Sequence, residues 1–590
     1  MGESSFESLF GISHLCGSKF GIFMSRSVLS FCLLIYSGFV SAQLFQTPSY
    51  PLKQFRNPLD IPISLAANFG EIRLNHYHMG LDIRTEHREN LPVYAAADGY
   101  IYRIKIEPFG FGQAIYIRHT NGFVSLYAHL NSFYPALASY VKQKQYELES
   151  WDISLELPPD LLKVKKGELI AYSGNMGGSQ GPHLHFEIRT YPDDTNLNPM
   201  LFGLPITDNT SPVIRSLSAY DLNKSFYEQT PLIIQVKGNS GRYTISRQIF
   251  ILNTSNPGFG ISGYDTQLGS KNPNGIFQAI IYDNGLAVSG FRMDQISYND
   301  TRGINAHIDY PTHQRGGPYY QLIFKMPGYS HSIYREAKTG GRLHLEDGKL
   351  HEIRIELKDP YGNSSNLEFK VRYQPEKKEN PVFPGKIFYP GMLDGFETPD
   401  AAFYLGEKCL YDSVHLVYQE IPLEGRDIVS SMHHFGTNQI PLADTMTVRI
   451  KLLIPVNQQQ RILMQRIDGE ESEVKKPEWL GDWATASFWS FGNFRLVLDT
   501  IPPVISIPGV LQNANLQKSS RIVILVEDNN KKIKNFRCTL DGKWLMFTND
   551  KAKAFIYHFD ENCKPGNHEL KIYAEDEAGN SATKILPFVR

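Results

Sequence analysis

Strand-length apolar segments alternate with glycine through residues 61–202, and this pattern favours a β-sheet over a helical bundle. The predicted strands are residues 93–96, 100–106, 114–119, 123–128, 169–173 and 183–189. Residues 134–149 differ, because their composition and apolar spacing predict a helix. The chain has 47 Gly, 35 Pro and 12% aromatic residues, which fit many short strands and turns. We therefore expect a mainly β protein.

An internal repeat organises the chain beyond residue 205. The repeated positions keep a constant offset of 217: His351, Asp359 and Gly362-Asn363 return as His568, Asp576 and Gly579-Asn580. Each copy predicts a strand, a turn opened by Asp and Gly-Asn, and a second strand. Each copy also follows a Pro-Val-Ile segment, at 212–214 and at 503–505. These units are expected to be Ig-like β-sandwiches, residues 208–375 and 499–590, flanking a third β-rich domain at 380–498.

Charge gives no reason to expect nucleic acid or an anionic membrane surface as a partner. The 590 residues include 59 Lys and Arg and 61 Asp and Glu, for a formal net charge of −2. The length suggests several domains, each large enough to bury its own core.

A secretory leader is predicted at residues 1–42, with Met24 as its expected true start. Arg26 forms a short positive region, residues 28–40 form an apolar region, and Val40-Ser41-Ala42 is a small-residue cleavage site before Gln43. The mature chain is expected in the periplasm, the cell envelope or the extracellular space. No later stretch reaches about 18 consecutive apolar residues, so no transmembrane span is expected after cleavage. Residues 43–60 read as a linker.

Three short segments carry the candidate chemistry. His78 and Asp82 lie in the first, His129 in the second, and His183 and His185 in the third. A catalytic zinc takes three protein ligands from His and carboxylate and leaves a fourth position to water. Side chains alternate along a strand, so both histidines of His-x-His project from one face. Each segment alone is weak evidence, since a single His-x-His is more often a surface or packing pair.

At these residues the sequence resembles the lysostaphin-type (LytM-like) zinc metallopeptidases, which cleave peptide bridges or stems of peptidoglycan. The resemblance covers residues 61–190. Within this range it includes, besides the three segments above, residues 69–71, 164–167 and 173–177. It implies an open antiparallel β-sheet groove within a peptidase domain at residues 61–205. It also implies that His78, Asp82 and His185 bind one Zn²⁺, with His129 and His183 beside the reacting carbonyl. The implied reaction is metal-assisted amide hydrolysis.

Several alternatives stay open at this point. Either His129 or His183 is the general base. An insertion near residues 131–165 borders the groove and would narrow it or hold it shut. Cys538 and Cys563 would form a disulfide in an oxidising compartment. A non-catalytic envelope regulator, or an adhesin-like scaffold that binds an envelope protein through its Ig-like domains, is the competing function. Gaps among the five candidate residues would favour the non-catalytic regulator, and the sequence has none.

Overall fold

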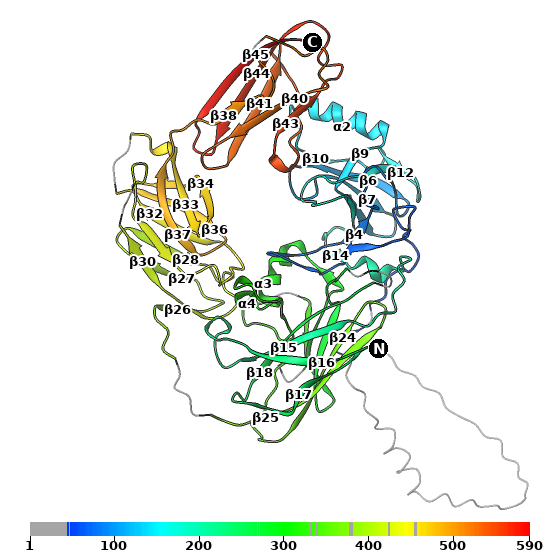
Figure 1. Ribbon diagram of the computed structural model, residues 1–590, viewed down its shortest axis with the longest axis vertical. Helices are drawn as coiled ribbons and strands as arrows, with labels where there is room; N and C mark the ends of the chain where they lie inside the picture. Colours follow the sequence, from blue (N-terminus) through cyan, green and yellow to red (C-terminus); the bar gives the residue numbers. More distant parts are fainter. Residues whose placement is uncertain are drawn as a thin grey trace, which may run out of the picture. The chain divides into compact units, whose positions relative to one another are not determined.

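The computed structural model describes residues 44–590 apart from 47, 268–269, 271, 330–331, 338–339, 377–380, 423–424, 454–456 and 512. The predicted leader, residues 1–42, lies outside the described residues. Within the described part of the chain, no helix combines the length and the hydrophobicity that crossing a bilayer requires. The protein is mainly β, as expected, and its successive sheets appear in chain order in Figure 1.

The candidate peptidase region is built on antiparallel strand pairs. Its main sheet has the order β1-β4-β13-β8-β7-β6-β10, and a smaller sheet has the order β5-β12-β9. The elements up to residue 202 are β1 Leu65–Ala67, β2 Ile72–Arg73, β3 His76–Tyr77, β4 Leu81–Arg84, β5 Pro92–Tyr94, β6 Gly99–Ile106, β7 Gln113–His119, β8 Phe123–Ala128, β9 Leu130–Phe133, α2 Pro135–Glu147, β10 Ile153–Glu156, β11 Lys163–Val164, β12 Leu169–Ser173, β13 His183–Thr190, β14 Asn196–Leu197 and the 3-10 helix η1 Pro199–Phe202.

The six strands and the helix predicted here are confirmed to within two residues at each end. The helix α2 starts with proline at its first position, where the missing N–H costs nothing. Its Leu137 and Val141 are buried in the same core as Leu184, Phe186 and Ile188 of β13. These three side chains of β13 share one face of the strand, and His185 and Glu187 on the opposite face are buried as well, so β13 is covered on both sides.

The next region supplies a wall beside the candidate site. Its elements are β15 Val213–Asp221, η2 Phe226–Glu228, β16 Leu232–Asn239, β17 Arg242–Leu252, β18 Pro257–Tyr264, β19 Gln278–Asp283, β20 Leu286–Arg292, β21 Gln295–Ile296, η3 Tyr298–Gly303, α3 Ile304–His307, α4 Tyr310–Gln314, β22 Gln321–Leu322, β23 Tyr334–Glu336, β24 His351–Lys358 and β25 Ser364–Tyr373. Phe69, Tyr77 and Met79 from the first region are buried in its core, and β21 pairs with β14. The segment that carries His78 is therefore fixed from both sides.

Two further β regions complete the described chain. The first packs two five-stranded sheets from β26 Lys386–Phe388, β27 Asp394–Glu397, β28 Ala401–Leu405, β29 Val414–Leu416, β30 Tyr418–Ile421, β31 Met432–Phe435, β32 Met446–Lys451, η4 Gln459–Arg461, β33 Ile462–Asp468, β34 Glu471–Lys475, β35 Glu478–Leu480, β36 Trp483–Phe488 and β37 Gly492–Leu498, with β26 and β29 as a separate pair. The second contains β38 Val504–Ser506, β39 Ala514–Asn515, β40 Arg521–Glu527, β41 Ile533–Leu540, β42 Lys543–Trp544, η5 Asp550–Ala552, β43 Phe555–His558, β44 Asn567–Asp576 and β45 Ser581–Val589. Each region has its own hydrophobic core.

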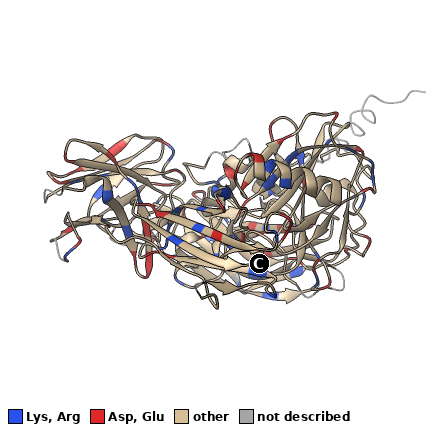
Figure 2. Cartoon of the chain, turned by 90° about the horizontal axis from the view of Figure 1, so that it is seen from above, with Lys and Arg blue, Asp and Glu red and all other residues tan. Residues whose placement is uncertain are grey.

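The internal repeat forms two hairpins, as predicted. β24 pairs with β25 and β44 pairs with β45, both antiparallel, around the turns opened by Asp359 and Asp576. Cys538 and Cys563 are both buried and free, so the structure does not show the disulfide that their positions allowed. Acidic and basic residues are interspersed over the strands in Figure 2.

Candidate active site

Strand register brings the predicted residues of the site together. β4 and β13 are antiparallel neighbours, and Asp82 lies directly opposite His185. On the other side of β13, His185 lies opposite Ala128, the last residue of β8 and the one before His129. Gly80 lets the two backbones approach, because a Cβ there would lie 2.5 Å from the Phe186 carbonyl oxygen. The glycine between His78 and Asp82 is thus required by packing.

The three residues predicted as metal ligands form one buried cluster. His78 Nε2 and His185 Nδ1 each lie 2.9 Å from Asp82 Oδ1. The two imidazole nitrogens are 3.1 Å apart. Each of the three residues is less than a tenth exposed.

The second ring nitrogen of each histidine is held by a fixed partner. His78 Nδ1 lies 2.7 Å from the Asn68 carbonyl oxygen, and His185 Nε2 lies 2.8 Å from Glu187 Oε1. Such contacts fix the tautomer and orientation of a ligand histidine. They leave His78 Nε2 and His185 Nδ1 as the nitrogens that face Asp82.

Glu187 is a site residue that the sequence analysis missed. It is fully buried and accepts hydrogen bonds from Arg189, Asn196 and Tyr298 as well as contacting His185. Alternation along β13 was a usable signal, since Glu187 is two residues beyond His185 and shares its face. Tyr298 comes from η3, more than 100 residues away, and no local pattern pointed to it.

His129 and His183 lie beside the cluster. Their ring centroids are 4.8 Å apart, and His183 Nε2 is 3.2 Å from Asp82 Oδ1. His129 has a left-handed backbone, φ +60°, which is uncommon for a residue with a side chain. Its N–H donates to the Phe111 carbonyl and its Nδ1 lies 2.8 Å from the Met176 carbonyl, so the strained conformation is held from two sides.

Burial and neighbouring charges set the protonation of the site. Burial raises the pKa of Asp82, but His78, His183 and His185 outweigh it and hold the pKa well below its ordinary value. Burial, with the charges of His185 and His183, lowers the pKa of His129 to about 3. Burial also opposes ionisation of Glu187, yet Arg189 and His185 lower its pKa to about 2. The cluster therefore holds two ionised carboxylates beside a neutral His129.

The donor set fits a divalent transition metal such as zinc. Two imidazole nitrogens and one carboxylate oxygen, all within 4.8 Å of one another, match the composition of a catalytic zinc site. Ligands about 2.0–2.1 Å from a tetrahedral ion are roughly 3.3 Å apart. The three separations here, 2.9, 2.9 and 3.1 Å, are close to that spacing.

The loop that leads into β13 contacts the C-terminal region. Gly177 N–H donates to Asp550 Oδ1 at 2.8 Å, and Lys551 Nζ donates to the Ser179 carbonyl. Ser179 Oγ in turn lies 3.1 Å from His183 Nδ1. The helix predicted as part of an insertion also faces this region, since Lys142 of α2 forms ion pairs with Asp560 and Glu561. The polar groups against the loop thus include Asp550 and Lys551 of η5.

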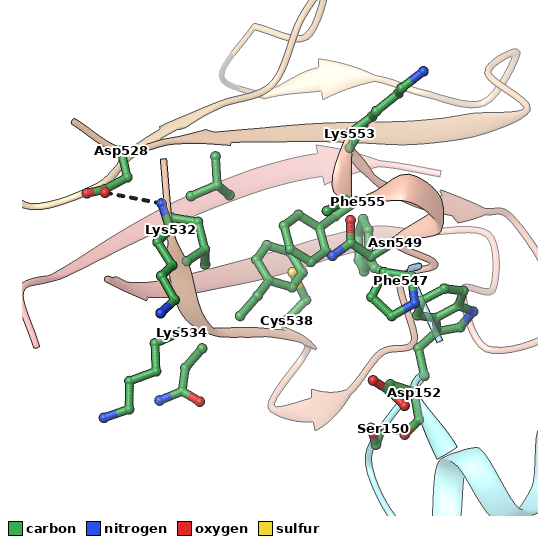
Figure 3. A pocket seen from close by; sticks show the side chains of 18 of the residues that line it. Ser150, Asp152, Asp528, Lys532, Lys534, Cys538, Phe547, Asn549, Lys553 and Phe555 are labelled. Atoms are coloured by element: carbon green, nitrogen blue, oxygen red, sulfur yellow. Dashed lines mark hydrogen bonds between the residues drawn. The ribbon is translucent and has the colours of Figure 1, made fainter. Parts of the chain in front are cut away.

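A separate cavity lies away from these residues. It has a volume of about 800 Å³ and is lined by strands of the C-terminal region together with residues 149–152. Figure 3 shows Phe547, Phe555 and Cys538 inside it and Lys532 and Lys534 at one side. None of the five predicted residues lines this cavity, so volume alone does not identify the chemistry of the chain.

The chain is similar to known proteins over two segments. The model for peptidase family M23 matches residues 76–146 and 161–199, and that for a Zu5-like domain matches residues 388–499. The DD-carboxypeptidase/endopeptidase Mpg of Neisseria meningitidis is 34% identical over 133 residues, which is 22% of this chain and 24% of that protein. Peptidoglycan DD-endopeptidase ShyA of Vibrio cholerae is 29% identical over 139 residues, 22% of this chain and 26% of that protein.

Among solved structures, the match to the catalytic domain of lysostaphin from Staphylococcus simulans covers 24% of this chain and 91% of the lysostaphin chain, with 24% identity and a TM-score of 0.18. The chain spans about a quarter of the length of the curated relatives it matches. The family match includes every residue of the buried cluster. Residues 76–146 and 161–199 of this chain therefore carry a domain of peptidase family M23.

Proposed function

We propose that the chain is an exported zinc metalloendopeptidase that hydrolyses peptide bonds in peptidoglycan. The observation that carries the proposal is the convergence of His78, Asp82 and His185 on one point, with His129 and His183 beside it. The substrate class is supported by relatives whose names give peptidoglycan as their target. The periplasm or cell envelope is the compartment in which such a substrate is available.

Each residue has a proposed part in the reaction. His78, Asp82 and His185 hold the zinc ion, which when bound supplies a Lewis acid and a water of lowered pKa. Asn68 and Glu187 hold the two ligand imidazoles in orientation. His129 and His183 each anchor Nδ1 on a carbonyl, of Met176 and Gly181, which directs Nε2 away from the anchor. In the neutral ring that nitrogen carries no hydrogen, so it takes a proton from the nucleophile and, once protonated, donates to the developing oxyanion.

Zinc analysis combined with a peptidoglycan digest tests the proposal. We expect one zinc per purified chain, and soluble muropeptides with new peptide termini and unchanged glycan strands. His185→Ala is expected to lose both zinc and activity, and His129→Ala to keep zinc but lose about 10²–10⁴-fold in rate. His87→Ala, at an exposed position, is the matched control and should behave as wild type.

Two results would contradict the proposal. Zinc retained by His185→Ala would remove that residue from the ligand set. Glycan fragments in place of peptide cleavage products would assign a different bond.

N-terminal sequencing of the protein recovered from cell envelopes tests export, with Gln43 as the expected first residue.

A further inference from the structure

Three carboxylates meet outside the peptidase site, at one edge of the second region. Asp208 precedes β15, Asp265 follows β18, and Asp359 follows β24. β15 and β18 are antiparallel, with Val213 opposite Tyr264, which places Asp265 next to the segment that enters β15. One oxygen from each carboxylate lies within 4.8 Å of the others. Asp265 and Asp359 are buried, and Asp208 is half-buried.

Asp265 lacks a partner for one of its two carboxylate oxygens. It is 4% exposed, and its Oδ1 accepts no hydrogen bond from any described group. Asp208 and Asp359 are partly satisfied, by Thr210 and by the amides of the turn at Asn363. Across the described residues, none of the three acids forms an ion pair with Lys or Arg. A buried charge without a partner is costly, so the arrangement requires either a proton or a cation.

The pKa of Asp265 reflects the absence of a compensating positive charge in this cluster. Burial, together with the charges of Asp359 and Asp208, raises the pKa of Asp265 to about 8. A bound divalent cation would reverse this repulsion and let all three acids ionise at neutral pH.

We propose that Asp208, Asp265 and Asp359 form a Ca²⁺-binding site that joins the segment after the peptidase domain to two strand ends of the next region. The donors are all hard oxygens, and no nitrogen or sulfur belongs to the cluster. Calcium takes six to eight oxygens at about 2.3–2.6 Å, so opposite ligands are roughly 4.6–5.2 Å apart. Magnesium needs a tighter octahedron and keeps several waters, which fits a half-buried carboxylate trio less well.

A second acidic cluster provides a matched comparison within the same chain. One oxygen each of Asp499, Asp528 and Asp576 also lies within 4.8 Å of the others. Val504 is paired with Glu527, so Asp528 follows the end of a paired strand just as Asp265 does. Here Asn529 and Asn530 donate to both oxygens of Asp499. Asp528 is half-exposed and accepts from Lys532 N–H, as Figure 3 shows. Asp528 Oδ1 also has no hydrogen-bond partner, but both oxygens of Asp499 accept amide donors and Asp528 is more exposed than Asp265. The proposal is therefore confined to the first cluster.

Calcium titration of the full chain in two variants tests the site. Asp528→Asn removes any contribution of the second cluster, and Asp265→Asn is then added to it. We expect the Asp528→Asn chain to bind one more Ca²⁺ than the double variant in equilibrium dialysis. We also expect calcium to raise its Tm by several degrees while leaving the Tm of the double variant unchanged. Without calcium, the double variant should melt no lower, since Asp265→Asn removes the repulsion from Asp208 and Asp359 and keeps an amide oxygen as acceptor.

Asp208→Asn in the Asp528→Asn background is the second variant, and it should also lose the extra calcium ion. Equal calcium binding with and without Asp265 would overturn the site. An equal Tm shift with Mg²⁺ at the same concentration would overturn the assignment to calcium. His185→Ala should keep the full calcium response, which separates this test from that of the proposed peptidase function.

Discussion

His185 and Glu187 face the same side of β13, and His185 Nε2 lies 2.8 Å from Glu187 Oε1. Because Nε2 is committed to this contact, Nδ1 faces Asp82 and the proposed zinc ion. The carboxylate itself is held by Arg189, Asn196 and Tyr298. The orientation of one proposed ligand therefore depends on a chain of buried contacts that extends into the second region.

Glu187→Gln should weaken zinc binding about 10–100-fold, because an amide holds the His185 ring less firmly than a carboxylate. The zinc dissociation constant, measured by competition with a chelating dye, checks this. Glu156→Gln, on the exposed face of β10, is the control. A folded Glu187→Gln protein with wild-type zinc affinity would show that the contact does not position the ligand.

Lys551→Ala should raise the rate of peptidoglycan cleavage several-fold. Lys551 bonds the Ser179 carbonyl, next to the His183 contact, and so occupies a backbone group that an extended peptide substrate would use. Losing one such hydrogen bond changes a free energy by on the order of 1 kcal/mol. Lys553→Ala, two residues along and exposed, is the matched control for initial rates. A slower Lys551→Ala enzyme would mean that η5 supports the loop rather than covering it.

His119 should make stability fall as the pH falls. It is buried between the Asp98 carbonyl and Ser125 Oγ, and burial lowers its pKa to about 4. The unfolded chain takes up this proton near pH 6.5, so the stabilisation is complete above that pH and is lost as the pH drops towards 4. Between pH 7 and pH 5 this one group should cost about 2 kcal/mol.

The measurement is the unfolding free energy from urea titrations at both pH values. His119→Gln cannot take up the proton and should show a smaller loss on acidification, by about the same amount. His87→Gln, at an exposed position, should keep the wild-type loss. An unchanged pH dependence in His119→Gln would exclude this histidine as its source.

Local patterns predicted the elements of this chain well, because strand alternation and glycine breaks act over a few residues. His183 and His185 on one face of β13, and the hairpins at Asp359 and Asp576, follow from such patterns. The same rule could have predicted Glu187. It is two residues beyond His185 and therefore lies on the same face of the strand.

Contacts between distant segments were not predictable in the same way. Tyr298 reaches Glu187 across 111 positions, and Lys551 reaches Ser179 across 372. The register of β15 with β18 brings Asp265 beside the segment of Asp208, and Asn363 of the Asp359 turn donates to the Asp208 carbonyl. The sequence pattern leaves both contacts open. The same holds for the loop that leads into β13. The sequence analysis considered only residues 131–165 as a neighbour of the groove, and no local pattern indicated that η5 would contact this loop.

Anomalous diffraction at the zinc edge, from crystals grown with zinc, tests the central claim most directly. The account predicts one strong peak about 2.0–2.2 Å from His78 Nε2, Asp82 Oδ1 and His185 Nδ1, with His129 and His183 nearby but not bonded to the ion. A zinc peak coordinated by any other set of residues, or no peak at this cluster, would contradict it.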